Sequence, residues 1–185
     1  MREAGYYHVY NRGCNRQPIF LDDDNYVFLL RKVKACLPLY DLTIIAYCLM
    51  PNHYHLLVHA RQEDVLSPFL QRLFSGYVQA FNKQHGRSGT LFEGRARWVA
   101  VTSDPYVLQL CRYIHLNPVK AGLVGDPAAW PYSNYLDCAG LRSGTIRDDA
   151  FMHMFFTSPA DYADFVMGAL GDELGGAGLE AYMLD

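Results

Sequence analysis

Two histidines separated by a single residue, His53 and His55, stand at the start of an apolar stretch of the chain. Alternate residues of a β-strand point to the same face of its sheet. If this stretch is a strand, both imidazoles project from one face, while Tyr54, Leu56 and Val58 can enter a core on the other. Neutral imidazole is a good ligand for divalent metals. The spacing therefore predicts a two-histidine metal site that needs no loop to form it.

A tyrosine and an asparagine about sixty residues further on offer complementary groups. Tyr113 and Asn117 are four residues apart in a segment of helical character, which makes them neighbours on one helix face. If that helix packs over the histidine strand, the Asn117 carbonyl oxygen can join the metal ligands, and the Tyr113 phenol can reach a phosphate bound by the metal. His115, two residues from each, points roughly the opposite way and is a weaker candidate ligand.

These groups suggest chemistry on a phosphodiester. A metal held by two imidazoles and an amide keeps open positions for phosphate oxygens and can stabilise the charge that develops in a transition state. A phenol with an ordinary pKa of about 10 is a weak nucleophile at neutral pH and needs help from the metal or a base. Its attack would leave a phosphotyrosyl intermediate, which allows the strand to be rejoined. A metal hydrolase would use the histidines with water instead, and taken singly each motif is more often structural.

Hydrophobic periodicity predicts the elements that position these residues. Strands are expected at residues 6–11, 42–49, from 53 onward, and 95–102; helices are expected from the acidic cluster at 22–24 to Pro38, from Ser67-Pro68 to Gly86, and over Tyr106–Leu116, where Pro118 closes the helix. The first six elements follow the split βαβ order. We therefore predict an α+β, ferredoxin-like antiparallel sheet with helices on one face, the tyrosine-bearing helix near the open face, and a C-terminal extension.

The bulk composition fits a single domain. The chain has 185 residues, 51% of them hydrophobic, which is enough for a sizeable core. No stretch approaches the roughly 20 apolar residues that cross a bilayer, and the first residues lack the apolar segment of a signal peptide. Five cysteines without Cys-x-x-Cys spacing argue against a disulfide framework or a zinc ribbon. These features predict a cytoplasmic protein that does not bind membranes.

Charge is divided unevenly along the chain. Residues 1–125 carry 14 basic and 9 acidic side chains, a net charge of +5, whereas residues 126–185 carry 2 basic and 10 acidic ones, a net charge of −8. A basic body is compatible with a polyanionic ligand, but ordinary variation of surface charge explains it about as well. The acidic extension is expected to be partly helical or poorly ordered, above all in the glycine-rich stretch 171–178.

Several motifs in a fixed order resemble one known family. Residues 46–57 around the histidines are similar to the His-hydrophobic-His motif of single-tyrosine transposases, and residues 112–124 to their tyrosine-helix motif. Three further matches are Asn11-Arg12-Gly13, Leu91-Phe92-Glu93-Gly94-Arg95 and Trp130-Pro131-Tyr132-Ser133-Asn134-Tyr135. The resemblance is to the REP-associated branch, proteins linked to bacterial repetitive extragenic palindromes. It spans roughly residues 6 to 136, so that residues 1–125 are interpreted as the catalytic domain.

The resemblance implies a site and a reaction. Tyr113 would be the nucleophile, His53 and His55 metal ligands, and Asn117 the third ligand, with Mg²⁺ or Mn²⁺ as the metal. The substrate would be single-stranded DNA with palindromic hairpins, cleaved to a 5′-phosphotyrosine and a free 3′-OH. The protein would act as a monomer or homodimer at the bacterial nucleoid. A catalytically inactive hairpin-binding protein of the same fold is the alternative.

Basic residues near these motifs are candidates for phosphate contacts, because phosphate groups receive most of the hydrogen bonds in protein–DNA complexes. We expect this role for six side chains: Arg12, Arg16, Arg95, Arg97, Arg112 and Lys120. Arg95 and Arg97 alternate on one face of the expected strand, where a merely solvated surface is an equal alternative.

Overall fold

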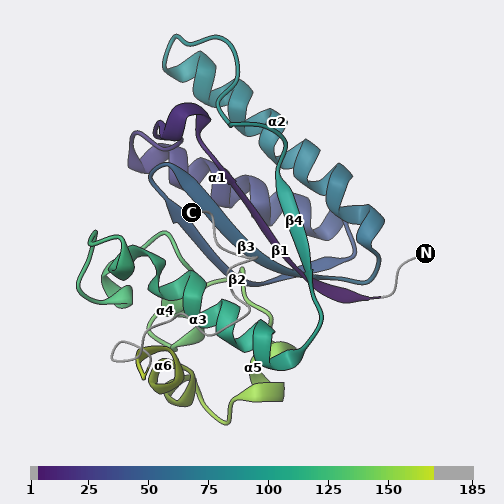
Figure 1. Cartoon of the computed structure of the whole chain (residues 1–185), viewed down its shortest axis with the longest axis vertical. Helices are drawn as coiled ribbons and strands as arrows, with labels where there is room; N and C mark the ends of the chain where they lie inside the picture. Colours follow the sequence, from purple (N-terminus) through teal and green to yellow (C-terminus); the bar gives the residue numbers. More distant parts are fainter. Residues whose placement is uncertain (1–3, 169–185) are drawn as a thin grey trace.

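The computed structural model describes residues 4–168 of the chain. Its centre is an antiparallel sheet in the order β2-β3-β1-β4, in which the histidine strand pairs with strands on both sides (Figure 1). The strands are β1 (Gly5–Arg12), β2 (Leu42–Met50), β3 (His53–Ala60) and β4 (Arg97–Val101). This order is that of a split βαβ sheet, and the predicted fold class is confirmed.

Helices cover both faces of the sheet. They are α1 (Asp23–Cys36), α2 (Leu66–Gln84), α3 (Asp104–Lys120), α4 (Tyr135–Cys138), α5 (Asp149–Phe155) and α6 (Pro159–Met167), with short 3-10 turns η1 (Cys14–Arg16), η2 (Leu37–Leu39), η3 (Glu63–Val65) and η4 (Pro127–Ala129). Figure 1 shows α2 on one side of the sheet and α3 to α6 gathered on the other. Each side has its own core: the first joins α1 and α2 to the sheet, and the second joins α3 to α6 to the opposite face.

The alternation of β3 decides which core each of its side chains enters. Tyr54, Leu56 and Val58 are buried in the core with α1 and α2. Leu57, of the opposite parity, belongs to the core with α3. The parity of the two histidines therefore directs them to the face that α3 covers, as the pattern predicts.

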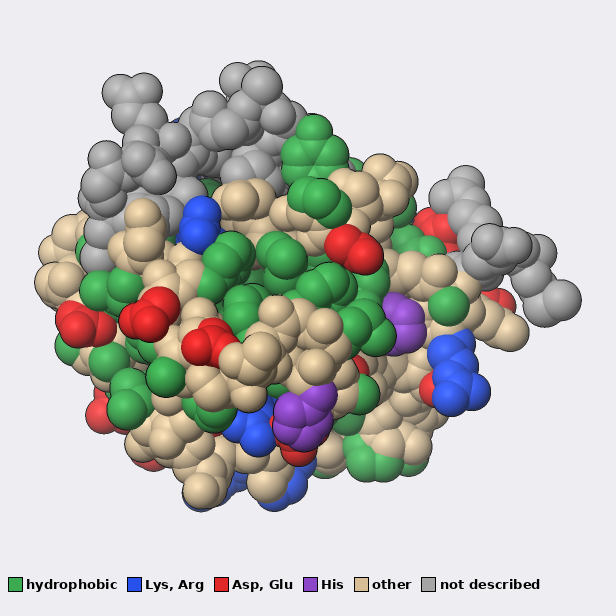
Figure 2. Space-filling view, turned by 90° about the horizontal axis from the view of Figure 1, so that it is seen from below, with side chains coloured by type: hydrophobic (Ala, Val, Ile, Leu, Met, Phe, Trp, Pro, Cys, Tyr) green, Lys and Arg blue, Asp and Glu red, His purple; other side chains and the backbone are tan. Residues whose placement is uncertain are grey.

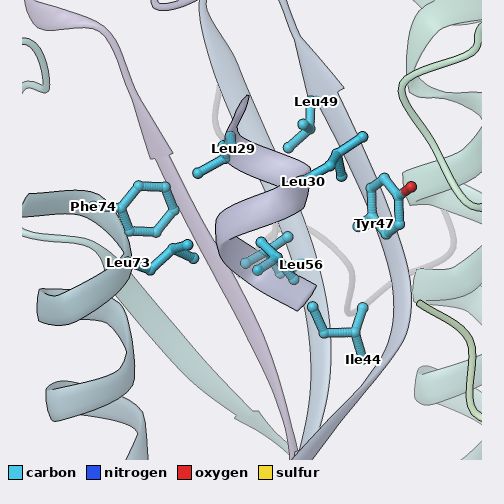
Figure 3. A pocket seen from close by; sticks show the side chains of 9 residues that line it. Leu29, Leu30, Ile44, Tyr47, Leu49, Leu56, Leu73 and Phe74 are labelled. Carbon is cyan, nitrogen blue, oxygen red and sulfur yellow. The ribbon is translucent and has the colours of Figure 1, made fainter. Parts of the chain in front are cut away.

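The core between α1, α2 and the sheet contains one small cavity of about 10 Å³ (Figure 3). Leu29 and Leu30 of α1 line it together with Leu73 and Phe74 of α2. This volume matches a single water-sized sphere. A water needs about two to four polar partners, and Tyr47 is the only one of the lining residues with a polar side-chain atom. The cavity is a packing gap rather than a ligand site.

The end of α3 differs from the prediction. Pro118 was expected to close this helix, but α3 continues to Lys120 and carries Pro118 inside its last turn. A proline lacks the N–H of the helical ladder, but the residues after it keep theirs. The amide of Ala121 still donates to the carbonyl of Asn117 at 2.9 Å, and Gly122, with a φ of 68°, ends the helix in the left-handed conformation. Asn117 therefore lies within the helix and not at its end.

The described part of the acidic extension is folded against α3. Tyr135, Phe151, Tyr162 and Val166 are buried in the same core as α3. Figure 2, viewed from the side of α5 and α6, shows hydrophobic side chains at the centre of this surface with acidic ones beside them. The predicted helical content is present, the stretch 171–178 lies outside the described residues, and the predicted boundary at residue 125 stays a prediction. No helix in residues 4–168 has the length and apolar character needed to span a membrane.

Candidate active site

Four side chains meet where α3 crosses the face of β3 that carries the two histidines. The rings of His53 and His55 have centroids 5.1 Å apart and are nearly perpendicular. The ring of Tyr113 on α3 lies 5.4 Å from that of His55, again edge to face. The Oδ1 atom of Asn117, one helical turn later, is 3.2 Å from Nε2 of His53. The structure thus brings together all four residues that the sequence predicts as nucleophile and metal ligands.

The ring of His53 has a lone pair available on the nitrogen that faces Asn117. Its Nδ1 lies 2.8 Å from Oδ1 of Asn52, and because a carbonyl oxygen only accepts, Nδ1 must carry the proton. In its neutral form the ring then has an acceptor at Nε2, which faces another acceptor, Oδ1 of Asn117. A cation between these two atoms satisfies both. The donor set therefore fits a divalent metal.

His55 offers a second nitrogen to the same place. The residue is fully buried, and its Nδ1 lies 2.9 Å from Nε2 of His8. Its Nε2 is buried without a hydrogen-bond partner among the described residues. Burial, reinforced by the neighbouring His8 and His53, holds the pKa of His55 well below its usual value, so the ring is neutral. An orphaned neutral nitrogen beside His53 is what a metal ligand requires.

Asn117 is the predicted third ligand. Within residues 4–168, no group of three or more His, Cys, Asp or Glu side chains is arranged to hold a metal ion. The carbonyl oxygen of Asn117, 3.2 Å from Nε2 of His53, could complete a three-donor set with His53 and His55. Such a set leaves positions open for phosphate oxygens.

The turn before His53 is fixed by the segment after β1. The amide of Gly13 donates to the carbonyl of Asn52 at 2.7 Å, and the side-chain amide of Asn52 donates to the carbonyl of Arg16 at 3.2 Å. The amide of Ile19 donates to the carbonyl of Pro51 at 2.8 Å. These bonds orient Asn52, whose side chain in turn sets the ring of His53. The backbone around Gly13 thus supports the site by fixing the turn before His53.

Replacing Gly13 by alanine is expected to destabilise the protein by about 2 kcal/mol, because overpacking typically costs 1–3 kcal/mol. A Cβ atom there would lie 1.9 Å from the carbonyl oxygen of Gln17, so the backbone must move. Urea unfolding monitored by circular dichroism measures the change. Gly94→Ala is the control, since a Cβ at Gly94 meets nothing within 4 Å. Equal stability of both variants would contradict this account of the turn.

His115 has a structural role, in agreement with its low ranking as a ligand. It is fully buried, its Nε2 lies 2.9 Å from Oδ1 of Asn134, and the hydroxyl of Tyr162 lies 2.7 Å from its Nδ1. The side chain of Asn134 also accepts from the amide of Tyr47 at 2.7 Å and donates to the carbonyl of Ile45 at 3.0 Å. This network joins α3 to β2 and to α6, and so holds the tyrosine-bearing helix on the sheet.

The buried neutral state of His115 makes stability depend on pH. Burial lowers the pKa of His115 to about 4, below its ordinary value of 6.5. Between these values the unfolded chain binds a proton that the folded chain does not, so the free energy of unfolding falls by about 1.4 kcal/mol per pH unit for each such group as the pH drops. The free energy of unfolding, measured with urea between pH 6.5 and 5, should depend less steeply on pH in His115→Gln than in the wild type. The difference should correspond to the uptake of about one proton on unfolding. Identical slopes would contradict the assignment.

Three of the predicted DNA-binding residues lie near the site. Arg12 pairs with His53 across β1 and β3, and Arg97 pairs with Tyr10, which in turn pairs with His55, so both share the histidine face of the sheet. Arg12 also forms an ion pair with the exposed Glu93. The Nζ atom of Lys120 lies 5.4 Å from the centroid of the Tyr113 ring. Their positions suit phosphate contacts, which stay predictions.

The other three lie elsewhere. Arg16 is exposed on η1, and Arg95 precedes β4 and lines a cleft of about 700 Å³ beside α2. The guanidinium group of Arg112 donates to the carbonyl of Phe165 at 2.9 and 2.6 Å and stacks on the Phe165 ring at 4.1 Å. Arg112 is therefore engaged in holding α6 on α3.

His8, Asn52 and Asn134 were missed by the sequence interpretation. The sequence predicts a strand on which His8 and Tyr10 point to the same face. Because Tyr10 lies opposite His55, His8 lies on the histidine face, but this pairing is known only from the structure. The two asparagines act through contacts that local patterns do not encode.

Comparison with known proteins identifies the family and agrees with the fold. The family model of IS200-like transposases matches residues 2–117. The chain belongs to this family of transposases. A curated protein of Haemophilus influenzae, provisionally named a REP-associated tyrosine transposase, is 28% identical over 106 residues, which are 52% of this chain and 60% of the relative. The chain thus matches less than two thirds of that relative's length.

A solved structure shows the same fold. It is that of a REP-associated tyrosine transposase bound to a REP hairpin, and it superposes with a TM-score of 0.63. Its sequence is 21% identical, and the match covers 80% of this chain and 90% of that chain. The structural match covers a larger share of this chain than residues 2–117, which the family model matches.

Proposed function

We propose that this transposase cleaves and rejoins single-stranded DNA that carries palindromic hairpins, through a 5′-phosphotyrosine intermediate and with a divalent cation. The observation that carries the proposal is the meeting of Tyr113, His53, His55 and Asn117 at one point of the fold. Hairpin DNA is suggested by the relative of the same fold that was solved with a REP hairpin.

The chemistry follows from what these side chains can do. The Tyr113 oxygen attacks the phosphorus, the new phosphorus–oxygen bond to tyrosine forms, and the bond to the 3′-oxygen breaks. The phenolic proton leaves for solvent or a base, and the 3′-oxygen leaves as a hydroxyl after taking up a proton. His53, His55 and Asn117 would hold Mg²⁺ or Mn²⁺, which when bound polarises the phosphate and stabilises its developing charge. Reversal with another 3′-OH rejoins the strand.

Three basic side chains would bind the phosphates that flank the scissile bond. Arg12 and Arg97 lie on the histidine face, and Lys120 lies against the Tyr113 ring. Residues 126–185, which carry a net charge of −8, contribute none of these three side chains. Salt therefore should weaken DNA binding steeply, because each neutralised phosphate releases counterions.

The test is a covalent-capture assay. Hairpin oligonucleotides with varied flanking sequences, labelled on the 3′ side of candidate cleavage points, are incubated with the protein and Mn²⁺ and analysed on denaturing gels. A labelled band at the mass of protein plus DNA supports the proposal. Hairpin binding without any adduct across the sequences would favour the alternative of an inactive DNA-binding protein. Cleavage to a free 5′-phosphate without an adduct would favour a water-using hydrolase.

A further inference from the structure

A third histidine lies behind the candidate metal ligands and is not one of them. The rings of His8 on β1 and His55 on β3 are stacked, with centroids 5.1 Å apart and planes within 15°. Nε2 of His8 lies 2.9 Å from Nδ1 of His55, and both side chains have no exposed surface. A hydrogen bond between two imidazoles forces one nitrogen to donate and the other to accept.

The direction of this bond decides whether His55 can bind a metal. If His8 donates, then Nδ1 of His55 is the acceptor, the proton of the neutral ring sits on Nε2, and Nε2 has no lone pair to offer. If His55 donates, Nε2 of His55 keeps its lone pair. Each arrangement leaves one buried proton without a hydrogen-bond partner among the described residues, on Nε2 of His55 in the first and on Nδ1 of His8 in the second, so these atoms do not choose between the two. Only the second arrangement leaves Nε2 of His55 able to bind the proposed cation.

We propose that His8 is a positioning residue that accepts a hydrogen bond from Nδ1–H of His55 and holds the ring in the tautomer whose Nε2 can bind the cation. The inference rests on the proposed role of His55 as a ligand. It assigns to β1 a part in the site that neither the histidine motif nor the tyrosine helix supplies.

The chemical character of His8 suits a site that binds phosphate. Metal-bound histidines usually donate their second N–H to a carboxylate, a carbonyl or water, which fixes the ring. A carboxylate in this position would add a negative charge beside the cation. The neutral imidazole of His8 orients His55 and leaves the positive charge of the cation available to the DNA.

The experiment compares His8→Phe with His8→Gln in the full-length protein without DNA. Phenylalanine keeps an aromatic ring in the stack but cannot accept, whereas the Gln oxygen can reach the place of Nε2. Mn²⁺ affinity is measured by electron paramagnetic resonance of the free ion. His8→Phe should lose about 10- to 100-fold in affinity, the range seen when such supporting groups are removed. His8→Gln should bind within about threefold of the wild type by the same reasoning.

A second readout needs no metal. Two-bond ¹H–¹⁵N correlation spectra of metal-free protein identify the tautomer of His55, which we expect to be protonated on Nδ1 in the wild type and in His8→Gln. His8→Phe should shift it toward Nε2. The control is His59→Phe, which removes a histidine of the same strand parity, four residues along β3, that contacts the Tyr6 ring instead.

The outcomes separate this inference from the proposed function. If the wild type and His8→Phe bind Mn²⁺ equally well, the proposed role of His8 is wrong and the proposed function is unaffected. A wild-type His55 protonated on Nε2 also overturns the proposed role of His8. Failure of the wild type to bind any divalent cation overturns the metal-dependent function and the inference together. The inference is supported if His8→Phe loses Mn²⁺ affinity and His8→Gln keeps it. A purely structural defect would not depend on whether the new side chain can accept a hydrogen bond.

Discussion

Replacing Tyr113 by phenylalanine is expected to abolish the covalent protein–DNA adduct and to lower strand cleavage on the order of 10³-fold or more, as removal of a nucleophile does. The substitution removes one oxygen and keeps the ring that packs 5.4 Å from His55. The fold and the binding of hairpin DNA should therefore persist. Adduct formation on denaturing gels measures the first effect, and fluorescence anisotropy with a labelled hairpin measures the second.

The same helix offers a matched control. Tyr106 is a half-exposed tyrosine in the first turn of α3, with 37% of its surface accessible. Tyr106→Phe removes the same oxygen from the same helix and should cleave at the wild-type rate. Undiminished cleavage in Tyr113→Phe would show that water or another side chain is the nucleophile, and an adduct that maps to a different tyrosine would refute the assignment.

Replacing His53 by alanine is expected to weaken Mn²⁺ binding on the order of 100-fold or more, since removal of an outer supporting group alone costs 10- to 100-fold. Cleavage should fall in parallel and should also disappear when the wild type is treated with a chelator. Adding Mn²⁺ back should restore the wild type but not His53→Ala. Metal titration in the absence of DNA and the adduct assay measure the two effects.

The control for this prediction is His59→Ala. His59 follows His53 and His55 on the same strand with the same parity, but its ring packs on Tyr6 at 4.9 Å rather than on Tyr113. Its removal should leave metal affinity and cleavage unchanged. If both histidine variants lose metal binding equally, the effect is a general one on β3. If neither does, the cation binds elsewhere or is not required.

The site is assembled within one chain. The contact between His53 and Asn117 joins residues 64 positions apart, and the network around His115 and Asn134 ties α3 to the sheet of its own chain. The described helices of the extension complete this attachment through Arg112 and Phe165. No exchange of the tyrosine helix between two copies is needed to bring the four residues together. The monomer, one of the two states predicted, therefore has all the proposed catalytic groups.

The amino-acid sequence by itself was enough to predict the order of elements, the fold class and the pairing of functional groups within each element. His53 and His55 share a strand face, and Tyr113 and Asn117 share a helix face, because the periods of strands and helices are properties of the local backbone. These patterns need only a few neighbouring residues. They fail at Pro118, where the helix continues because later amides still find their acceptors.

Tertiary structure alone decided which residue supports His55 and how the extension holds the tyrosine helix. His8 reaches His55 through a strand pairing between residues 47 positions apart, and Asn134 reaches Tyr47 across 87 positions. Such contacts depend on register and on the packing of two separate cores. A shift of one residue in register would turn His8 to the opposite face. Local patterns carry no information on that register, so only the folded chain shows the third histidine.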